Sequence, residues 1–372
     1  ITTISGINSS LIGYGLGIAV ADINLDGYPD IYIGNDFHEN DYLYINNGKG
    51  VFTEEITSRI AHTGRFTMGV DVADVNNDGQ SEIISMDMLS DDPYTLKRSL
   101  GEDDYDIFNL KVSYGYQHQY TRNNLQYNRG NGHFSEVGLY SGIAATDWSW
   151  SPLWIDFDND GLKDLFISNG IPKRMNDIDY INFVSNEEIQ KKLAPGQNKG
   201  NNLEMIEKFP RIKIRNKFFR NNGSLAFSDI GSGIRNAKET YSNGAVYADF
   251  DNDGDLDIVV NNIDEAAHLY RNNNTDATIT GQTTAAAQSG KASLSVTNDT
   301  LAALPSFTVS LVGDSLNRQG IGSKLIVCAD GAIRLYEKFG VHGFQSSTNI
   351  PFHVGLRNTK IDSILLVWPD NT

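Results

Sequence analysis

The stretch GIAVADINLDGYPDIYIG, residues 17–34, contains the feature that decides the fold, a nine-residue acidic loop between two strand-like runs. Its side-chain oxygens at loop positions 1, 3, 5 and 9 come from Asp22, Asn24, Asp26 and Asp30. Oxygen donors at this spacing suit calcium, which takes oxygen ligands at roughly 2.3–2.6 Å, and Gly27 at position 6 permits the sharp turn. The alternating apolar flanks lack the helices of an EF-hand, so we predict a turn within a β-sheet.

The same loop occurs three more times, and we number the copies loop 1 to loop 4 in chain order. Positions 1, 3, 5 and 9 of the later copies are Asp74, Asn76, Asp78 and Glu82; Asp156, Asp158, Asp160 and Asp164; and Asp249, Asp251, Asp253 and Asp257. A cluster of turn-forming Asp and Asn residues can produce one such loop without a metal. Four copies in one register predict metal ligands and about four calcium ions.

The spacing of the loops predicts a β-propeller. Their first ligands are 52, 82 and 93 residues apart. A second signature, LYINNGKGVFTE from Leu43 in the first copy, follows each loop and shows that copies 2 and 3 carry insertions of 30 and 41 residues. We place these insertions at residues 89–122 and 171–214; without them the period is 52 throughout. A period of roughly 50 with several strands per unit is typical of propeller blades.

Residues ahead of the loops add a family pattern. Three copies place an aromatic residue three positions before a glycine, in the pairs Tyr14 and Gly17, Phe66 and Gly69, and Tyr241 and Gly244. The third copy departs from this, with Trp148 and Ser151. Together with the acidic loops, residues 11–275 resemble the FG-GAP or VCBS repeat of integrin-α-type calcium-binding propellers. Such propellers have seven blades, so the resemblance implies that the four visible blades belong to a larger ring.

The last part of the chain resembles a second family. The motifs NRQGIGSKL from Asn317, GFQSS from Gly343, HVGL from His353 and LVWPDN from Leu366 are similar to the ASPIC/UnbV domain. In cartilage-acidic-protein-like chains this domain follows such a propeller. Alternating strand patterns in the same region independently predict a small β domain. We therefore predict propeller blades at residues 1–275, a Thr/Ala/Ser-rich linker at 276–304 and the β domain at 305–372.

The composition excludes some partners. The net charge is −17 over 372 residues, and the four loops supply 14 carboxylates, so metal binding explains much of the acidity. Nucleic-acid binding requires clustered Lys and Arg, which the sequence lacks, so we exclude it. We also predict no transmembrane segment, because the chain has no run of 18 apolar residues.

The predicted setting is extracellular or at the cell surface. Calcium loops of extracellular modules work with dissociation constants around 10⁻⁴ to 10⁻³ M, a range that cytosolic calcium does not reach. The family resemblance implies a bacterial outer membrane, where the chain would be a subunit of a membrane-anchored complex. The predicted partner is a protein or an extracellular glycan.

The sequence favours a binding module over an enzyme. It contains no HExxH, GxSxG or Walker A motif, and its seven histidines are scattered. The alternative is a calcium-dependent polysaccharide lyase or glycosidase, because some calcium-binding propellers are lyases. That alternative requires a rim groove with a free Lys, Tyr or His opposite a calcium site.

Aromatic residues give two further expectations. The two insertions are rich in Tyr and Phe, and we interpret them as a partner-binding face on a rigid scaffold, the alternative being solvated decoration. Trp148, Trp150 and Trp154 alternate and are predicted to share one side of a strand. Packing between blades and a sugar-stacking platform both remain open.

Ligand counts predict an order of affinity. Loops 3 and 4 have four carboxylates each, whereas loops 1 and 2 have three and an asparagine. Loops 3 and 4 are therefore predicted to hold calcium more tightly.

Overall fold

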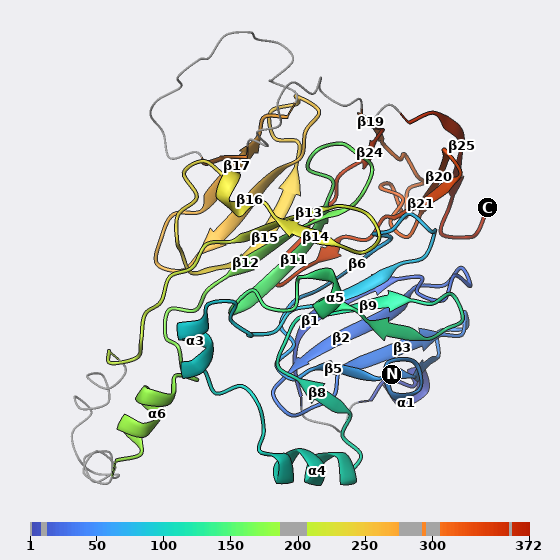
Figure 1. The fold of residues 1–372 in the computed structure, drawn as a ribbon. Helices are drawn as coiled ribbons and strands as arrows, with labels where there is room; N and C mark the ends of the chain where they lie inside the picture. The colour runs from blue at the N-terminus through green and yellow to red at the C-terminus, as the bar shows by residue number, and fades with distance from the viewer. Residues whose placement is uncertain (1, 9–12, 187–206, 275–291, 295–305, 357–358) are drawn as a thin grey trace.

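The regular secondary structure consists mainly of β-strands with a few short helices, which confirms the predicted all-β class. The computed structural model describes residues 2–8, 13–186, 207–274, 292–294, 306–356 and 359–372. Four sheets of four strands follow one another along the chain; in the described structure, the smaller sheets are one two-stranded pair within the first half of the chain and three formed by C-terminal strands (Figure 1).

We call the four sheets blades 1 to 4. Blade 1 consists of β1 (Tyr14–Ala21), β2 (Asp30–Asp36), β3 (Tyr42–Asn46) and β4 (Phe52–Glu54), and blade 2 of β6 (Val70–Ala73), β7 (Glu82–Ser85), β9 (Asn124–Asn128) and β10 (Phe134–Glu136). Blade 3 consists of β11 (Ser149–Ile155), β12 (Asp164–Asn169), β13 (Lys217–Asn221) and β14 (Phe227–Asp229), and blade 4 of β15 (Ser242–Ala248), β16 (Asp257–Asn262), β17 (His268–Asn272) and β18 (Ala292–Leu294). Neighbouring strands are antiparallel except β17 and β18, which are parallel. Strand β18 falls within the predicted linker, most of which lies outside the described residues.

The blades bury their faces against one another. Successive strand residues point to opposite faces of a sheet, so each blade offers apolar side chains on both sides. Three buried clusters join consecutive blades through pairs such as Leu43 and Val70, Ile84 and Leu165, and Phe166 and Ile258. This packing of sheet on sheet, repeated along the chain, is the arrangement expected of propeller blades.

Short helices lie outside the blades. They are α1 (Thr2–Ser5), α2 (Ile56–Arg59), α3 (Pro93–Arg98), α4 (Tyr105–Ser113), α5 (Gly138–Ser141), α6 (Ile178–Val184) and the 3₁₀ turn η1 (Gly231–Gly233). Two further strands, β5 (His62–Gly64) and β8 (His118–Tyr120), pair in parallel.

The two predicted insertions emerge from neighbouring blades and meet each other. The first, between β7 and β9, contains α3, α4 and β8; the second, between β12 and β13, contains α6, and its residues 187–206 lie outside the described part. The guanidinium of Arg98 donates to the carboxylate of Asp177 at 3.0 and 3.1 Å. Figure 1 shows the three helices at the same end of the molecule.

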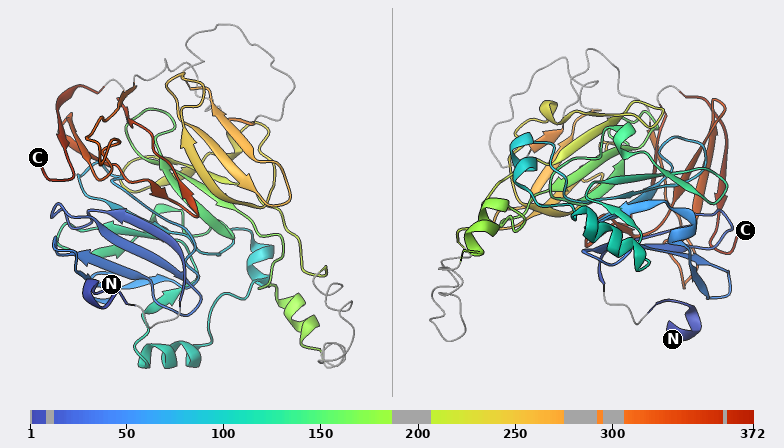
Figure 2. Two further views of the ribbon diagram at one scale, coloured as in Figure 1. Left: turned by 180° about the vertical axis from the view of Figure 1, so that it is seen from behind. Right: turned by 60° about the horizontal axis from the view of Figure 1, so that its bottom comes forward.

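The C-terminal domain packs onto the blades. Its strands are β19 (Ser306–Val309), β20 (Lys324–Ala329), β21 (Ala332–Glu337), β22 (Val341–His342), β23 (Ser346–Ser347), β24 (Phe352–Gly355) and β25 (Ile361–Val367). One sheet has the order β21-β20-β25, and β19 pairs with β24 around a shared apolar core. The hairpin β22–β23 reaches the first strand of every blade, because β22 contacts β1, β6 and β11 and β23 contacts β15 (Figure 2).

Candidate metal centres

Loops 1 to 4 join the first and second strands of blades 1 to 4 and share one backbone structure. In loop 3, the amide of Asp160 donates to Asp156 Oδ1 at 3.0 Å and the amide of Gly161 to Asp156 Oδ2 at 2.8 Å. The same two bonds occur in the other loops at 2.7–3.2 Å. The position 6 glycines have φ between +83° and +93°, where a Cβ is unfavourable. The loops are therefore turns between strands, as predicted.

The carboxylate at loop position 9 closes loops 1, 3 and 4 onto their blades. Asp30 Oδ2 accepts from the amide of Ile23 at 3.0 Å, and Asp30 Oδ1 accepts from the amide of Asn46 at 2.8 Å. Asp164 and Asp257 make both bonds in loops 3 and 4. Burial outweighs these bonds and raises the pKa of Asp30 to about 7. An ionised Asp30 therefore needs further positive charge nearby.

The asparagine of the second signature has a role that the sequence interpretation missed. Its side-chain amide donates to the position 2 carbonyl of the loop in the preceding blade. These bonds, at 2.8–3.3 Å, run from Asn128 to Ile23, from Asn221 to Val75 and from Asn272 to Phe157. Its regular recurrence in the repeat was the available signal, and the structure shows that this residue ties loops 1 to 3 to the next blade.

Loops 3 and 4 gather carboxylates within reach of a single ion. Carboxylate oxygens lie within 4.8 Å of one another in two groups, Asp156, Asp158 and Asp164, and Asp249, Asp251 and Asp253. The predicted ligands Asp160 and Asp257 are not part of these groups. Burial, with the charges of Asp160 and Asp158, raises the pKa of Asp156 to about 7. A divalent cation reverses this unfavourable charging, and carboxylate oxygens are the donors that calcium prefers.

Loop 2 contains a buried carboxylate oxygen that lacks a partner. Glu82 is 0% exposed; its Oε2 accepts from the amide of Val75 at 3.0 Å, but its Oε1 has no hydrogen-bond partner. In loops 1, 3 and 4 the matching oxygen accepts from the backbone amide of the signature asparagine at 2.7–2.8 Å, whereas the equivalent amide of Asn128 interacts with Glu82 only weakly and lowers its pKa slightly. Burial raises the pKa of Glu82 to about 9. An unpartnered buried polar group costs about 1–3 kcal/mol, so a cation ligated by Oε1 fits this site.

Three of the four loops also hold a basic side chain against their ligands. The shortest contacts are Arg220 Nη2 to Asp158 Oδ2 at 2.7 Å in loop 3, Arg271 Nε to Asp251 Oδ2 at 2.5 Å in loop 4, and the ammonium of Lys324 to the carboxylate of Asp22 in loop 1. Within the described residues, no Lys, Arg or His nitrogen lies within 4.0 Å of a loop 2 carboxylate. Loop 2 is thus distinguished by the absence of a basic side chain in direct contact with its described ligands; the buried ammonium of Lys163 interacts with Asp74 only electrostatically, at longer range.

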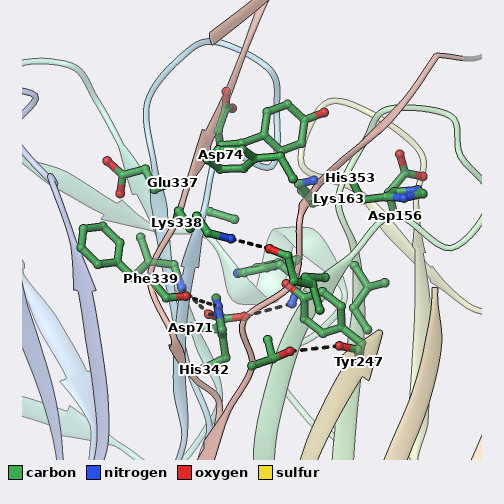
Figure 3. Close-up of a pocket in the computed structure, with 18 of the residues that line it drawn as sticks. Asp71, Asp74, Asp156, Lys163, Tyr247, Glu337, Lys338, Phe339, His342 and His353 are labelled. Carbon is green, nitrogen blue, oxygen red and sulfur yellow. Dashed lines mark hydrogen bonds and ion pairs between the residues drawn. The ribbon is translucent and has the colours of Figure 1, made fainter. Parts of the chain in front are cut away.

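A cavity of about 100 Å³ lies between loops 2 and 3 and the C-terminal domain (Figure 3). Its basic groups are engaged within the protein, through His342 Nδ1 to Asp71 Oδ1 at 2.8 Å, Lys338 Nζ to the Ile350 carbonyl at 2.5 Å, and Lys163 Nζ over the Tyr336 ring at 4.0 Å. Small-molecule sites usually measure roughly 300–1,000 Å³. The cavity therefore suits water molecules or an ion better than a sugar.

The tryptophans are packing residues. Trp148 and Trp154 are buried, and the half-buried Trp150 contacts the ring of Phe344 at 4.7 Å. A bulge between Ser149 and Pro152 interrupts the alternation of β11, so Trp154 joins a different apolar cluster from Trp148. The prediction that all three share one side is wrong for this reason. Packing between blades is confirmed for Trp154, which joins blades 2 and 3.

Comparison with known families matches segments in both parts of the chain. The FG-GAP-like repeat family matches residues 22–85 and 105–167, and the family named ASPIC and UnbV matches residues 313–372. The chain therefore contains FG-GAP-like repeats, which imply a β-propeller. More particularly, its repeats are followed by an ASPIC/UnbV domain, in the order that the motifs predict. No curated protein matches the chain.

The family match covers three of the four metal loops. The matched residues include loops 1 to 3, whereas loop 4 lies outside them and is assigned by its equivalent hydrogen bonds. In the described residues, no helix has the length and apolar character needed to cross a membrane.

Proposed function

We propose that the chain is an exported calcium-binding propeller that acts as a recognition and assembly module at the cell surface. The observation that carries this proposal is the charge imbalance of the repeated loops. They contain 14 carboxylates, many of them buried, whereas the basic groups found with them are fewer: Arg220, Arg271 and Lys324 form ion pairs with them, and the buried Lys163 acts on loops 2 and 3 at longer range. Calcium supplies the missing positive charge and the missing partner of Glu82 Oε1.

The proposed location follows from the chemistry of the loops. Calcium loops with weak to moderate affinity are filled where free calcium is abundant, which favours the outside of the cell. By family analogy, we propose a bacterial outer-membrane complex that includes this chain as one subunit.

The first insertion offers a surface for a protein partner. Ile107, Leu110 and Tyr114 lie at i, i+3 and i+7 of α4 and its C-cap, on one helix face, and are 47%, 50% and 76% exposed. The opposite face is anchored by Phe108, whose ring stacks on that of Tyr120 at 5.9 Å. Anchors at this spacing are typical of a helix that docks into an apolar groove. We therefore favour a protein partner over a glycan.

We propose a non-catalytic role. The Lys and His side chains of the interdomain cavity are engaged with protein groups, and the cavity is small. Lys324, which lines a second hollow of about 310 Å³ beside loops 1 and 2, is engaged with Asp22, and these contacts favour a binding role over that of a lyase.

The proposal is tested by recovering partners from detergent-extracted membranes with the immobilised full chain, in calcium or in EGTA. We expect a protein that is retained in calcium and reduced at least tenfold by Leu110→Asp. Leu139→Asp provides the matched control, because Leu139 is 66% exposed on α5, outside the insertions. Equal recovery with both variants would exclude the α4 face, and recovery unaffected by EGTA would exclude a calcium requirement.

A further inference from the structure

The C-terminal domain contacts the propeller through its own family motifs. One residue of each motif reaches a blade or loop: Lys324 contacts Asp22, the Phe344 amide donates to Ser151 Oγ at 3.2 Å, His353 Nε2 lies 2.6 Å from Asn159 Oδ1, and Asn371 Nδ2 donates to the Gly27 carbonyl at 3.4 Å. Three of these four contacts are with metal loops. The motifs of this domain therefore mark the surface by which it docks on the propeller.

Strand β21 lies directly on loop 2. The amide of Leu335 donates to Asp74 Oδ2 at 2.9 Å, and the amide of Ile333 donates to the Asn77 carbonyl at 3.3 Å. A Cβ on Gly79 would lie 3.0 Å from Ile333 Cγ2, so the two segments approach closely. The first ligand of loop 2 is thus held by an amide of the other domain as well as by its own loop.

The other loops are organised differently. In loops 3 and 4 the extra carboxylate is offset by Arg220 or Arg271, which must move aside for a cation to reach those oxygens. In loop 1 the C-terminal domain supplies an ammonium, that of Lys324, to the first ligand. At loop 2 the same domain supplies a neutral backbone N–H, which orients Asp74 without competing as a charge. Lys163, across the cavity, is beyond ion-pair distance of Asp74 and lies over the Tyr336 ring.

Building on the calcium binding proposed above, we propose that loop 2 is an interdomain metal site. It binds the first calcium ion of the four loops, and that ion fixes β21 of the C-terminal domain on the propeller. Asp74 takes part both in calcium binding and in the docking of β21, because one of its oxygens accepts a hydrogen bond from the Leu335 amide and its carboxylate ligates the ion. Linkage then requires each event to strengthen the other by the same factor.

The test is a calcium titration of the metal-stripped full chain. Native mass spectrometry counts bound ions, and hydrogen exchange with mass spectrometry follows each loop and β21. We expect the first ion to protect loop 2 and β21 together, before the other loops. In Asn76→Ala, which removes the position 3 ligand of loop 2, we expect β21 protection to require about tenfold more calcium.

Asn24→Ala is the matched control. Asn24 and Asn76 occupy the same loop position, and each donates to the position 5 carboxylate, at 3.0 and 2.9 Å. We expect Asn24→Ala to leave the β21 midpoint unchanged. Equal midpoints in the two variants, or first-ion protection at loop 3 or 4, overturn the proposal. Binding of four ions without protection of β21 overturns it while leaving calcium binding intact, whereas a chain that binds no ion refutes the proposed function itself. The wild-type order of protection decides the matter even if Asn76→Ala fails to fold.

Discussion

Loops 2 and 3 share a backbone but differ in the charges around them. In both loops, the carboxylate at position 1 accepts hydrogen bonds from the backbone amides of positions 5 and 6. Loop 3 has four carboxylates and Arg220 beside them, whereas loop 2 has three, no basic partner within ion-pair distance among the described residues, and an unpartnered Glu82 oxygen. Ligand count predicts tighter binding at loop 3, and counter-charge predicts it at loop 2. The comparison teaches that cation affinity depends on what surrounds the ligands as well as on their number.

The largest expected effect is that of removing calcium from all loops. A ligand that binds only the native state at 100 times its dissociation constant contributes about 2.7 kcal/mol, so several occupied loops contribute several kcal/mol. We expect EGTA to lower Tm by roughly 10 °C or more, with recovery on adding calcium back. Differential scanning calorimetry measures this. An unchanged Tm would show that calcium does not stabilise the native state, and the affinities of the loops could then not be compared.

Lys324→Met tests the resident cation of loop 1. The side chain is 14% exposed and contacts Asp22, and its Nζ lies 3.9 Å from Glu337 Oε1, so its loss leaves two nearly buried carboxylates uncompensated. Breaking a buried ion pair typically costs about 3–5 kcal/mol. We expect a loss of about 3 kcal/mol in EGTA and a smaller loss in calcium, because the ion then replaces the ammonium.

Urea unfolding in both buffers measures this effect. Lys238→Met is the control, because Lys238 is exposed and forms no ion pair with a loop carboxylate among the described residues. An equal loss in EGTA and in calcium would show that Lys324 stabilises the domain contact without influencing metal binding.

The sequence predicts what is determined locally. Each metal loop is closed by bonds from position 1 to positions 5 and 6, so the motif alone specifies the turn. The blade period and the C-terminal motifs were likewise visible, because they repeat or are family-specific. The partner of Asp22, by contrast, is Lys324, 302 residues away in another domain, and no local pattern indicates such a contact. The bulge in β11 could not be predicted from the sequence either. One extra residue in the strand changes the side of the sheet to which a tryptophan points, but the spacing of the tryptophans in the sequence stays the same.

The arginines provide a direct measure of the competition between resident and bound cations. Arg220→Met removes a charge that is 26% exposed, and Arg271→Met removes one that is 37% exposed. We expect loop 3 to bind calcium up to about tenfold more tightly in Arg220→Met, because about 1 kcal/mol is typical of a partly exposed pair. Arg271→Met should have the smaller effect at loop 4, because water screens that pair more. Calorimetric titration of each variant measures the calcium affinity. Unchanged affinity in both variants would indicate that the number of ligands, and not the resident arginine, determines how tightly each loop binds calcium.

The smallest expected effect is a pH dependence at the interface between the C-terminal domain and the blades. Burial alone would lower the pKa of His342, but the charge of Asp71 and hydrogen bonds to Asp71 and to the Phe339 carbonyl outweigh it and raise this pKa above its usual value. The ring also faces Tyr247, and Lys338 lines the same cavity. The native state therefore binds the proton more tightly than the unfolded state, and the stabilisation is complete below about pH 6.5.

As the pH rises from about 6.5 through the raised pKa, this stabilisation is lost, and we expect a decrease of about 1 kcal/mol or less in saturating calcium. Urea unfolding from pH 6 to pH 9 should show the slope in the wild type and lose it in His342→Gln. His268→Gln is the control, because burial and the charge of Lys238 lower the pKa of His268, a shift opposite in direction to that of His342. A slope that persists in His342→Gln would assign the pH dependence to other groups and leave calcium as the main determinant of how the C-terminal domain is held.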